Sequence, residues 1–349
     1  MPAGCGRSKP SESAAVHNDA LSLLTETRFQ PPSGWRWGAF RNADGARLRY
    51  GWAEPPDQQR GVVVFLPGFQ ATAEAVFETS RNLLDAGYAV WVLDRRGQGG
   101  SDRWLDNRQK SYSIGVEHDV HDVEIFAHAI VHGRAGEPRF LAGESLGGHI
   151  GFRVLHDKPD LFQAAAFSSP SIAFHTGAFP EWLVRMVTGT SVALGFGKAY
   201  AVGEHDWHFD PNAGNPDDPV KDDRNRALMS QAWFLKDPAL IAGGATNTFV
   251  TELFRSSALE QSPGWLESIK TPVLIGEVED DQIADASAMV RACARLAGCQ
   301  LMAFNGTRHA LFGDADSTRS IWIAALIAYF DSRQIGSATP GERRAGTTH

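Results

Sequence analysis

The chain has 349 residues, of which 43% are hydrophobic and 21% are charged, and its formal net charge is −8. This composition supplies enough apolar material for a full globular core, and the length suits one or two domains. The negative charge argues against nucleic acid or an anionic membrane surface as an electrostatic partner. No apolar run approaches the roughly 18 residues of a membrane span.

Cysteine usage favours a reducing compartment. The chain has three cysteines, at positions 5, 293 and 299, which are too few for a disulfide framework. The first residues also lack the charged and apolar regions of a secretory signal. We therefore expect unpaired thiols and a cytoplasmic location.

The first half of the chain predicts alternating strands and helices. Residues 1–33 are small, polar and proline-bearing, which predicts a loosely ordered tail. Two apolar runs joined by Asp44-Gly45 then predict a β-hairpin. The later alternation predicts an α/β fold with a mostly parallel, doubly wound sheet and helices on both faces. The expected strands are 35–40, 47–52, 61–66, 88–93, 138–142 and 162–168, and the expected helices are 74–86, 116–132 and 146–156.

This alternation stops between about residues 170 and 263. The stretch is rich in large apolar side chains such as Trp182, Trp207 and Phe249, and we expect a largely helical insertion that covers the site as a lid. The core then consists of 34–169 and 264–335, followed by a disordered tail at 336–349. In the second core segment, strands are expected at 271–276 and 300–304, and helices at 286–296 and 316–330.

The most informative motif is G-E-S-L-G at 143–147, between an expected strand and an expected helix. Strand, G-x-S-x-G and helix form the nucleophile elbow, a sharp turn that holds a serine hydroxyl clear of the sheet. Its glycines are needed because a Cβ would clash where strand and helix approach closely. Ser145 is therefore the candidate nucleophile, and the alternative is an ordinary small residue at a helix N-terminus.

An elbow serine needs a histidine base and an orienting carboxylate, in the chain order Ser, Asp/Glu, His. A carboxylate-rich loop follows the strand at 271–276, and His309 follows the strand at 300–304. Catalytic groups of open α/β sheets lie at such strand ends. His309 is therefore the candidate base, and the candidate acids are Glu279, Asp280 and Asp281.

Two other patterns favour structural roles. The glycine-rich run 94–103 lacks the lysine of a phosphate-binding loop, so we expect a tight turn whose Asp94 and neighbouring arginines anchor adjacent loops. Histidines on the helix at 116–132 could share one face and bind a metal. Acidic neighbours make a solvated polar face the better interpretation, and we expect no metal and no organic cofactor. These histidines are His118, His121, His128 and His132.

Three further stretches carry a family resemblance. They are V-V-V-F-L-P-G-F at 62–69, D-R-R-G-Q-G-G-S-D-R at 94–103 and T-R-H-A-L-F at 307–312. With the elbow, and in this order, they resemble the α/β-hydrolases of the bacterial lysophospholipase and monoacylglycerol-lipase type. The resemblance covers about residues 36–333. One departure is Pro67-Gly68, where the wider superfamily commonly has His-Gly.

The resemblance implies a serine hydrolase that cleaves a carboxylic ester through an acyl-enzyme, with a lysophospholipid or a monoacylglycerol as substrate. It implies Ser145, Asp281 and His309 as the catalytic triad. It also implies an oxyanion hole formed by the backbone N–H groups of Phe69 and Leu146.

The choice of acid follows the family pattern, in which the acid stands two residues before an apolar position that packs under the loop. Ile283 is that position here, which selects Asp281 and leaves Asp280 as the alternative.

Other functions stay open. A small-ester carboxylesterase or a peptidase would share the same core, and so would a ligand-binding protein with slow turnover. The apolar lid could also contact a membrane peripherally. The sequence does not indicate an oligomeric state.

Overall fold

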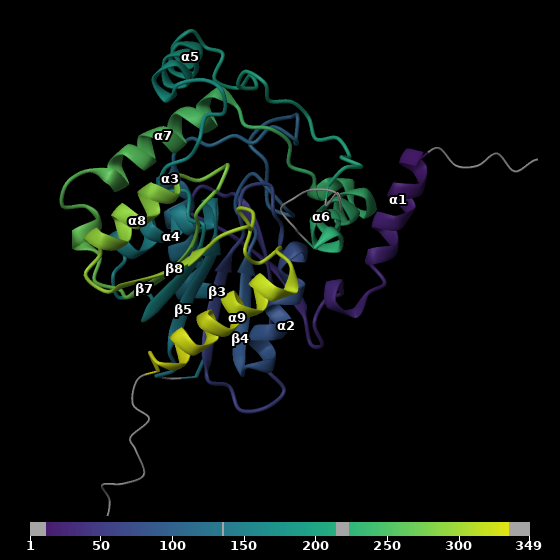
Figure 1. The fold of residues 1–349 in the computed structure, drawn as a ribbon, viewed down its shortest axis with the longest axis vertical. Helices are drawn as coiled ribbons and strands as arrows, with labels where there is room; N and C mark the ends of the chain where they lie inside the picture. Colours follow the sequence, from purple (N-terminus) through teal and green to yellow (C-terminus); the bar gives the residue numbers. More distant parts are fainter. Residues whose placement is uncertain (1–11, 135, 214–222, 335–349) are drawn as a thin grey trace, which may run out of the picture.

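An eight-stranded sheet forms the centre of the computed structural model, which describes residues 12–134, 136–213 and 223–334 (Figure 1). The strand order is β1-β2-β4-β3-β5-β6-β7-β8. β2 pairs with β1 and with β4 in antiparallel fashion, and all other pairs are parallel. The strands are β1 (Arg36–Arg41), β2 (Arg47–Ala53), β3 (Gly61–Leu66), β4 (Tyr88–Leu93), β5 (Arg139–Glu144), β6 (Ala164–Ser168), β7 (Val273–Val278) and β8 (Cys299–Phe304).

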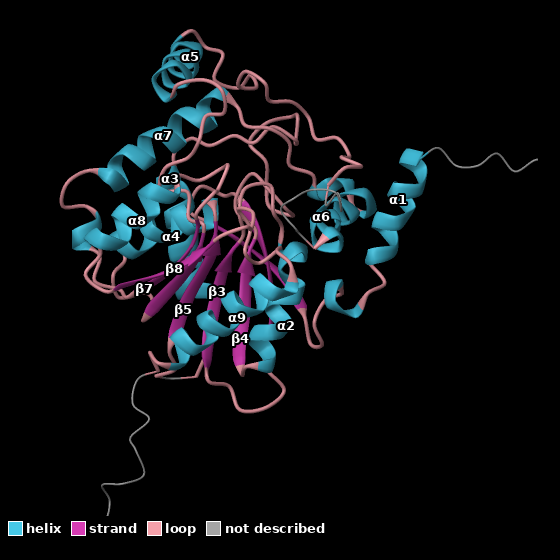
Figure 2. Cartoon of the chain, in the orientation of Figure 1, coloured by secondary structure: helices cyan, strands magenta, loops and turns pink. Residues whose placement is uncertain are grey.

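Helices cover both faces of the sheet (Figure 2). Side chains alternate along β3, so that Val62 and Val64 pack on one side and Val63 and Phe65 on the other. All four are buried, as expected for a central strand between two helical layers. One layer contains α3 (Val116–Ile125), α4 (Leu146–Asp157) and α8 (Ala286–Arg295), and the other contains α2 (Phe77–Asp85) and α9 (Asp316–Asp331). The predicted doubly wound α/β architecture is confirmed.

One expected helix is shorter than predicted. The pattern at 116–132 gives α3 only to Ile125, and a π-helical turn follows at Phe126–Ile130. Similarly, the helix expected at 74–86 begins as a 3₁₀ turn, Ala73–Val76, before α2.

The insertion between β6 and β7 contains three helices within the described residues: α5 (Glu181–Ala193), α6 (Arg224–Lys236) and α7 (Asn247–Gln261). Asp223 and Thr246 cap α6 and α7 by accepting hydrogen bonds from free backbone N–H groups. α5 packs on α7, beyond the carboxyl ends of the central strands (Figure 2). The insertion contains these helices and long connecting segments, and a largely helical lid over the site remains a prediction.

The prediction of a loose tail at 1–33 is wrong for the residues that the structure describes. α1 (Glu12–Leu23) and a 3₁₀ turn (Thr27–Phe29) precede the sheet, and α1 packs on α6. The reason is an apolar stripe that the polar composition hides: Ala20, Leu23 and Leu24 have i, i+3, i+4 spacing and are buried. Residues 1–11, and the predicted tail at 336–349, lie outside the described residues.

The prediction of unpaired cysteines is also wrong. Cys293 and Cys299 form a disulfide that links the end of α8 to the start of β8. The tight connection between these elements brings the two Cα atoms to 5.3 Å, within the range that a disulfide bridges. Cys5 lies outside the described residues.

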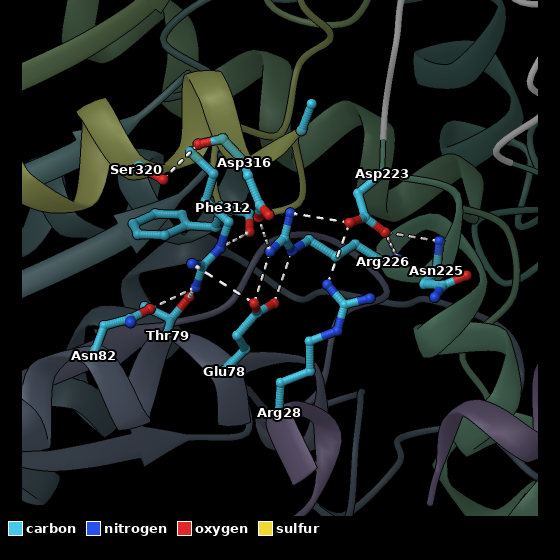
Figure 3. Close-up of polar contacts among 12 residues, drawn as sticks. Arg28, Glu78, Thr79, Asn82, Asp223, Asn225, Arg226, Phe312, Asp316 and Ser320 are labelled. Carbon is cyan, nitrogen blue, oxygen red and sulfur yellow. Dashed lines mark hydrogen bonds and ion pairs between the residues drawn. The ribbon is translucent and has the colours of Figure 1, made fainter. Parts of the chain in front are cut away.

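An ion-pair network around the buried Arg226 fastens α6 to the core (Figure 3). Arg226 on α6 is 6% exposed and forms a bidentate pair with Glu78 on α2, at 2.7 and 2.8 Å. It also donates to Asp316 at the start of α9. Arg28, from the N-terminal segment, pairs with Asp223 at the cap of α6. Bidentate pairs of this kind fix geometry as well as charge, so α6 has one defined position on the core.

Candidate active site

Ser145 stands alone between a strand and a helix. β5 ends at Glu144 and α4 begins at Leu146, so a single residue makes the turn. Its backbone has φ 52° and ψ −115°, a region that non-glycine residues rarely adopt. Such strain persists only where the surrounding packing imposes it, and it is common at functional sites.

The flanking glycines impose this turn. A Cβ on Gly147 would lie 2.0 Å from the carbonyl oxygen of Leu66 at the end of β3. A Cβ on Gly143 would lie 2.9 Å from the backbone carbon of Gly147. The predicted reason for both glycines, close approach of strand and helix, is therefore confirmed.

His309 and Asp281 meet at the same edge of the sheet. Asp281 follows β7, His309 follows β8, and His309 Nδ1 lies 2.6 Å from Asp281 Oδ2. The other oxygen, Oδ1, accepts from the backbone N–H groups of Ile283 and Ala284 at 2.8 and 2.9 Å. These bonds fix the carboxylate, so it can in turn fix the orientation and tautomer of the imidazole.

Of the alternative acids, the structure brings Asp281 and not Asp280 to His309. The Asp280 side chain is exposed, whereas Asp281 is 4% exposed. The family-based reason for choosing Asp281 is nevertheless wrong, because Ile283 does not pack under the loop. Ile283 is 54% exposed and lines a cavity, and its contribution to the acid is its backbone N–H.

Ser145 and His309 are not hydrogen-bonded to each other in the described part of the chain. His309 Nε2 is buried and has no hydrogen-bond partner there. The Ser145 hydroxyl instead lies 3.1 Å from the hydroxyl of Ser171, a residue that the sequence analysis missed. Catalytic hydrogen bonds are often unformed before substrate binds, so this geometry is compatible with a serine–histidine pair.

The two predicted oxyanion donors lie beside Ser145. Leu146 is the first residue of α4, where backbone N–H groups have no partner within the helix. Phe69 lies in the loop after β3, and Phe69, Leu146 and Ser145 line the same cavity. Gln98 fixes that loop by donating from Nε2 to the carbonyl oxygens of Gly68 and Ala71, both at 2.9 Å.

The glycine-rich run 94–103 anchors loops, as expected from its sequence. Asp94 is fully buried and accepts from the N–H groups of Ala73 and Gly100, both at 2.8 Å. Arg49 completes its surroundings with a side-chain bond at 2.5 Å. Gly99 has φ +56°, and a Cβ there would lie 2.4 Å from the Asp94 carboxyl carbon. This turn therefore supports the loop that carries Phe69.

Glu144, directly before the serine, adds a titratable group. Burial raises its pKa to about 6, and the nearby His309 partly opposes that change. With that pKa the Glu144 carboxyl group is mostly ionised at neutral pH.

A cavity of about 550 Å³ opens beside Ser145. Its size is that of a typical small-molecule pocket. One side of α5 faces it through Leu183 and Val187, and α7 contributes Phe249 and Phe254. Glu204 is the one carboxylate among the lining residues of the described chain, and no lysine or arginine lines the cavity there. The cavity is therefore mostly apolar, with one carboxylate, one histidine (His175) and a few hydroxyl groups.

A buried polar cluster that no sequence pattern predicted lies under the elbow. His149 on α4 is fully buried, and its Nδ1 lies 3.1 Å from Glu260 Oε2 on α7. Its Nε2 lies 2.8 Å from the hydroxyl of Ser256, which also accepts from Arg153. Burial raises the pKa of Glu260, and His149 opposes that change. No sequence motif marks these residues. The available signal is a histidine and an arginine, His149 and Arg153, on the buried face of the helix that follows the elbow.

The histidines of α3 do not gather into a metal site. His121 contacts Glu124 at 3.3 Å, and His118 lies 4.0 Å from Asp44. Across the described ranges, no group of three or more histidine, cysteine or acidic residues is arranged to hold a metal ion.

The family model described as serine aminopeptidase, S33, matches residues 57–316. The chain belongs to this family. The match spans the sheet from β3 onward, the elbow and the insertion, and it agrees with the α/β-hydrolase resemblance of the sequence motifs.

Individual relatives are distant. Lysophospholipase L2 of Escherichia coli (strain K12) is 24% identical over 278 residues, which cover 77% of this chain and 80% of that protein. Monoacylglycerol lipase of Mycolicibacterium smegmatis is 27% identical over 142 residues, covering 41% of this chain and 49% of that protein.

Solved structures show the same fold. A soluble variant of monoglyceride lipase from Saccharomyces cerevisiae, in complex with a substrate analogue, aligns with a TM-score of 0.67 at 18% identity, over 88% of this chain and 99% of that one. The monoacylglycerol lipase of Paleococcus ferrophilus aligns with a TM-score of 0.61 at 21% identity, over 81% and 98%.

Replacing Gly147 by alanine tests the packing of the elbow. Because the new Cβ would lie 2.0 Å from a backbone oxygen, α4 or β3 must shift, and we expect a loss of at least about 3 kcal/mol in the free energy of unfolding. Urea denaturation measures it. Gly189→Ala in α5 is the control, since no atom lies within 4 Å of its Cβ and helix propensity should improve by about 1 kcal/mol. Equal stability of the two variants would contradict the packing argument.

Proposed function

We propose that this protein hydrolyses carboxylic esters that carry one long acyl chain, through an acyl-enzyme on Ser145. The observation that carries the proposal is the 2.6 Å contact between His309 Nδ1 and Asp281 Oδ2. It lies at the edge of the sheet that also holds Ser145, and Ser145 lines a mostly apolar cavity. The names of the relatives, lysophospholipase and monoacylglycerol lipase, support the same substrate class.

In this mechanism His309 Nε2 takes the proton of Ser145 while the serine oxygen attacks the ester carbonyl. Asp281 holds the imidazole in the required tautomer and stabilises its charged form. The N–H groups of Phe69 and Leu146 stabilise the oxyanion, and one such donor is worth about 2.7–4 kcal/mol of the barrier. His309 then protonates the leaving alcohol, and water repeats the sequence on the acyl-enzyme. These steps use only side chains, backbone amides and water.

The cavity favours an uncharged head group. A phosphate is recognised by arginine, lysine or several N–H donors. The described lining includes one histidine, His175, but no arginine or lysine for that role, and Glu204 would repel an anion. A glycerol head group has hydroxyls that can donate to a carboxylate. Within the proposed class, we therefore favour monoacylglycerol over an anionic lysophospholipid.

A second candidate, an aminopeptidase, is favoured by the same carboxylate. Glu204 in an apolar cavity could pair with the ammonium group of a peptide N-terminus, and the family description includes this activity. Hydrolysis of aminoacyl anilides in preference to acyl esters would support this candidate.

We also propose that the outer face of the insertion contacts lipid surfaces. Trp182 and Met186 are one turn apart on α5, on the side away from the cavity, and are 65% and 53% exposed. Two more apolar side chains of the insertion that do not line the cavity, Leu194 and Phe196, are also exposed. Exposed apolar patches of this kind mark protein or membrane contact sites.

No helix among residues 12–134, 136–213 and 223–334 has the length and apolar content needed to cross a bilayer. A cytoplasmic location remains a prediction from the cysteine count. The Cys293–Cys299 bond weighs against it, since disulfides are rare in reducing compartments.

The triad assignment predicts the effect of three variants. Ser145→Ala should retain the fold and lose nearly all esterase activity. Asp281→Asn should reduce kcat by about 10⁴ because the histidine adopts the wrong tautomer, whereas Asp280→Asn should be mild. Steady-state hydrolysis of a p-nitrophenyl ester measures all three. An active Ser145→Ala variant would contradict the proposal. If a fluorophosphonate labels the protein but the protein hydrolyses no ester, a ligand-binding function would be favoured instead.

The cavity predicts two substrate trends. Each added methylene should raise kcat/KM about fourfold until the cavity is filled, because burying one is worth about 0.8 kcal/mol. When both substrates carry the same acyl chain and are assayed below the critical micelle concentration, monoacylglycerol should be hydrolysed faster than lysophosphatidate. Glu204→Gln should raise kcat/KM for lysophosphatidate severalfold by removing a repulsion of about 1 kcal/mol. The exposed Glu54→Gln is the matched control. A preference for acetate or butyrate esters would favour a small-ester carboxylesterase instead.

The exposed face of α5 predicts a defect that depends on lipid presentation. Trp182→Ser should weaken sedimentation with neutral phosphatidylcholine vesicles and slow the hydrolysis of vesicle-borne substrate. Activity on a soluble short-chain ester should stay the same, because the side chain points away from the cavity. Trp104→Ser, at another exposed tryptophan outside the insertion, is the control. Equal vesicle binding by all forms would count against lipid contact through α5.

A further inference from the structure

A second serine hydroxyl lies against the proposed nucleophile. Ser171 follows β6, is 5% exposed and lines the cavity. Its Oγ lies 3.1 Å from Ser145 Oγ. Neither the triad nor the oxyanion hole accounts for this hydroxyl.

The position of Ser171 is fixed on both sides of its backbone. Its N–H donates to the carbonyl oxygen of Ser145 at 3.1 Å. Its carbonyl oxygen lies 3.1 Å from Nδ1 of the buried His149, which is itself held by Ser256 and Glu260 on α7. The hydroxyl therefore reaches the nucleophile from a preorganised backbone, and its alignment needs no reorganisation during the reaction.

The surrounding groups determine which hydroxyl donates. His309 Nε2 is buried without a hydrogen-bond partner in the described chain, and its triad role requires the proton of Ser145. If Ser145 donates to His309, its oxygen is left to accept, and Ser171 is the hydroxyl within reach. When the Ser145 O–H to His309 Nε2 bond forms in the reactive complex, the arrangement that satisfies all three groups has Ser171 O–H donating to Ser145 Oγ.

We propose that Ser171 is a further catalytic residue, whose hydroxyl donates a hydrogen bond to Ser145 Oγ whenever that oxygen gains negative charge. The inference rests on the proposed function. In deacylation, His309 takes a proton from water as the water oxygen bonds to the acyl carbon. The bond from that carbon to Ser145 Oγ then breaks, its electron pair goes to Oγ, and the proton on His309 passes to Oγ. Ser171 keeps its own proton throughout and stabilises Oγ as it leaves.

Ser171→Ala removes the donor, and Ser168→Ala is the matched control. Ser168 is also fully buried, three residues upstream, and its hydroxyl has no partner in the described chain. Ser171→Thr keeps a hydroxyl at the same position. All three are compared with the wild type by steady-state and pre-steady-state hydrolysis of a soluble p-nitrophenyl ester, with thermal unfolding as a check of the fold.

We expect Ser171→Ala to lower kcat roughly 10- to 100-fold without raising KM, the effect of losing one hydrogen bond to a charged oxygen. The acyl-enzyme should accumulate, giving a larger burst of p-nitrophenol than in the wild type. Ser171→Thr should recover most of kcat, and Ser168→Ala should match the wild type. A kcat for Ser171→Ala within twofold of Ser168→Ala, or above the wild type, would overturn the inference.

The outcome is separable from the triad proposal. If Ser145→Ala is inactive and Ser171→Ala is fully active, the triad stands and Ser171 has only a packing role. If Ser145→Ala remains active, the acyl-enzyme on Ser145 is wrong, and the inference falls with it.

Discussion

The first turn of α4 lies so close to the end of β3 that no side chain fits between them. The geometry of the proposed active site depends on this close approach. Because Gly147 approaches the Leu66 carbonyl so closely, the N-terminus of α4 lies directly beside the loop after β3. Phe69 and Leu146, one from each segment, therefore line one cavity with Ser145. The same contact holds Ser145 at φ 52°, so core packing compensates for backbone strain at the proposed nucleophile.

Two buried polar clusters fix the insertion to this core from different sides. Arg226 joins α6 to Glu78, and Glu260 joins α7 to His149 beneath the elbow. The second cluster also contacts the Ser171 carbonyl oxygen through His149, so the contacts that hold α7 extend to a neighbour of the proposed nucleophile. α5 packs on α7, with apolar side chains facing both the cavity and the exterior. The site thus lies beside α7, which these contacts fix, and under α5, whose apolar side chains line the cavity.

Local sequence patterns predicted the features whose cause is local. The glycines of the elbow, the turn around Asp94 and the strand ends that carry Asp281 and His309 all follow from steric or periodic rules. Pairings between distant segments were not predictable. Ser171, Glu260 and the N-terminal helix have ordinary neighbours in sequence, and only the folded chain brings them to their partners. The Cys293–Cys299 disulfide was missed because the number of cysteines does not show that the end of α8 lies close to the start of β8.

The N-terminal segment has a practical consequence for any shortened form of this protein. Leu23, Leu24 and Phe29 cover Phe77 and Trp233, and Arg28 neutralises part of the charge on Asp223. The polar composition of residues 1–33 suggests that they could be removed. A protein that begins at Gly34 would, however, expose that aromatic surface to water. We expect it to aggregate during purification even though every residue of the active site is retained.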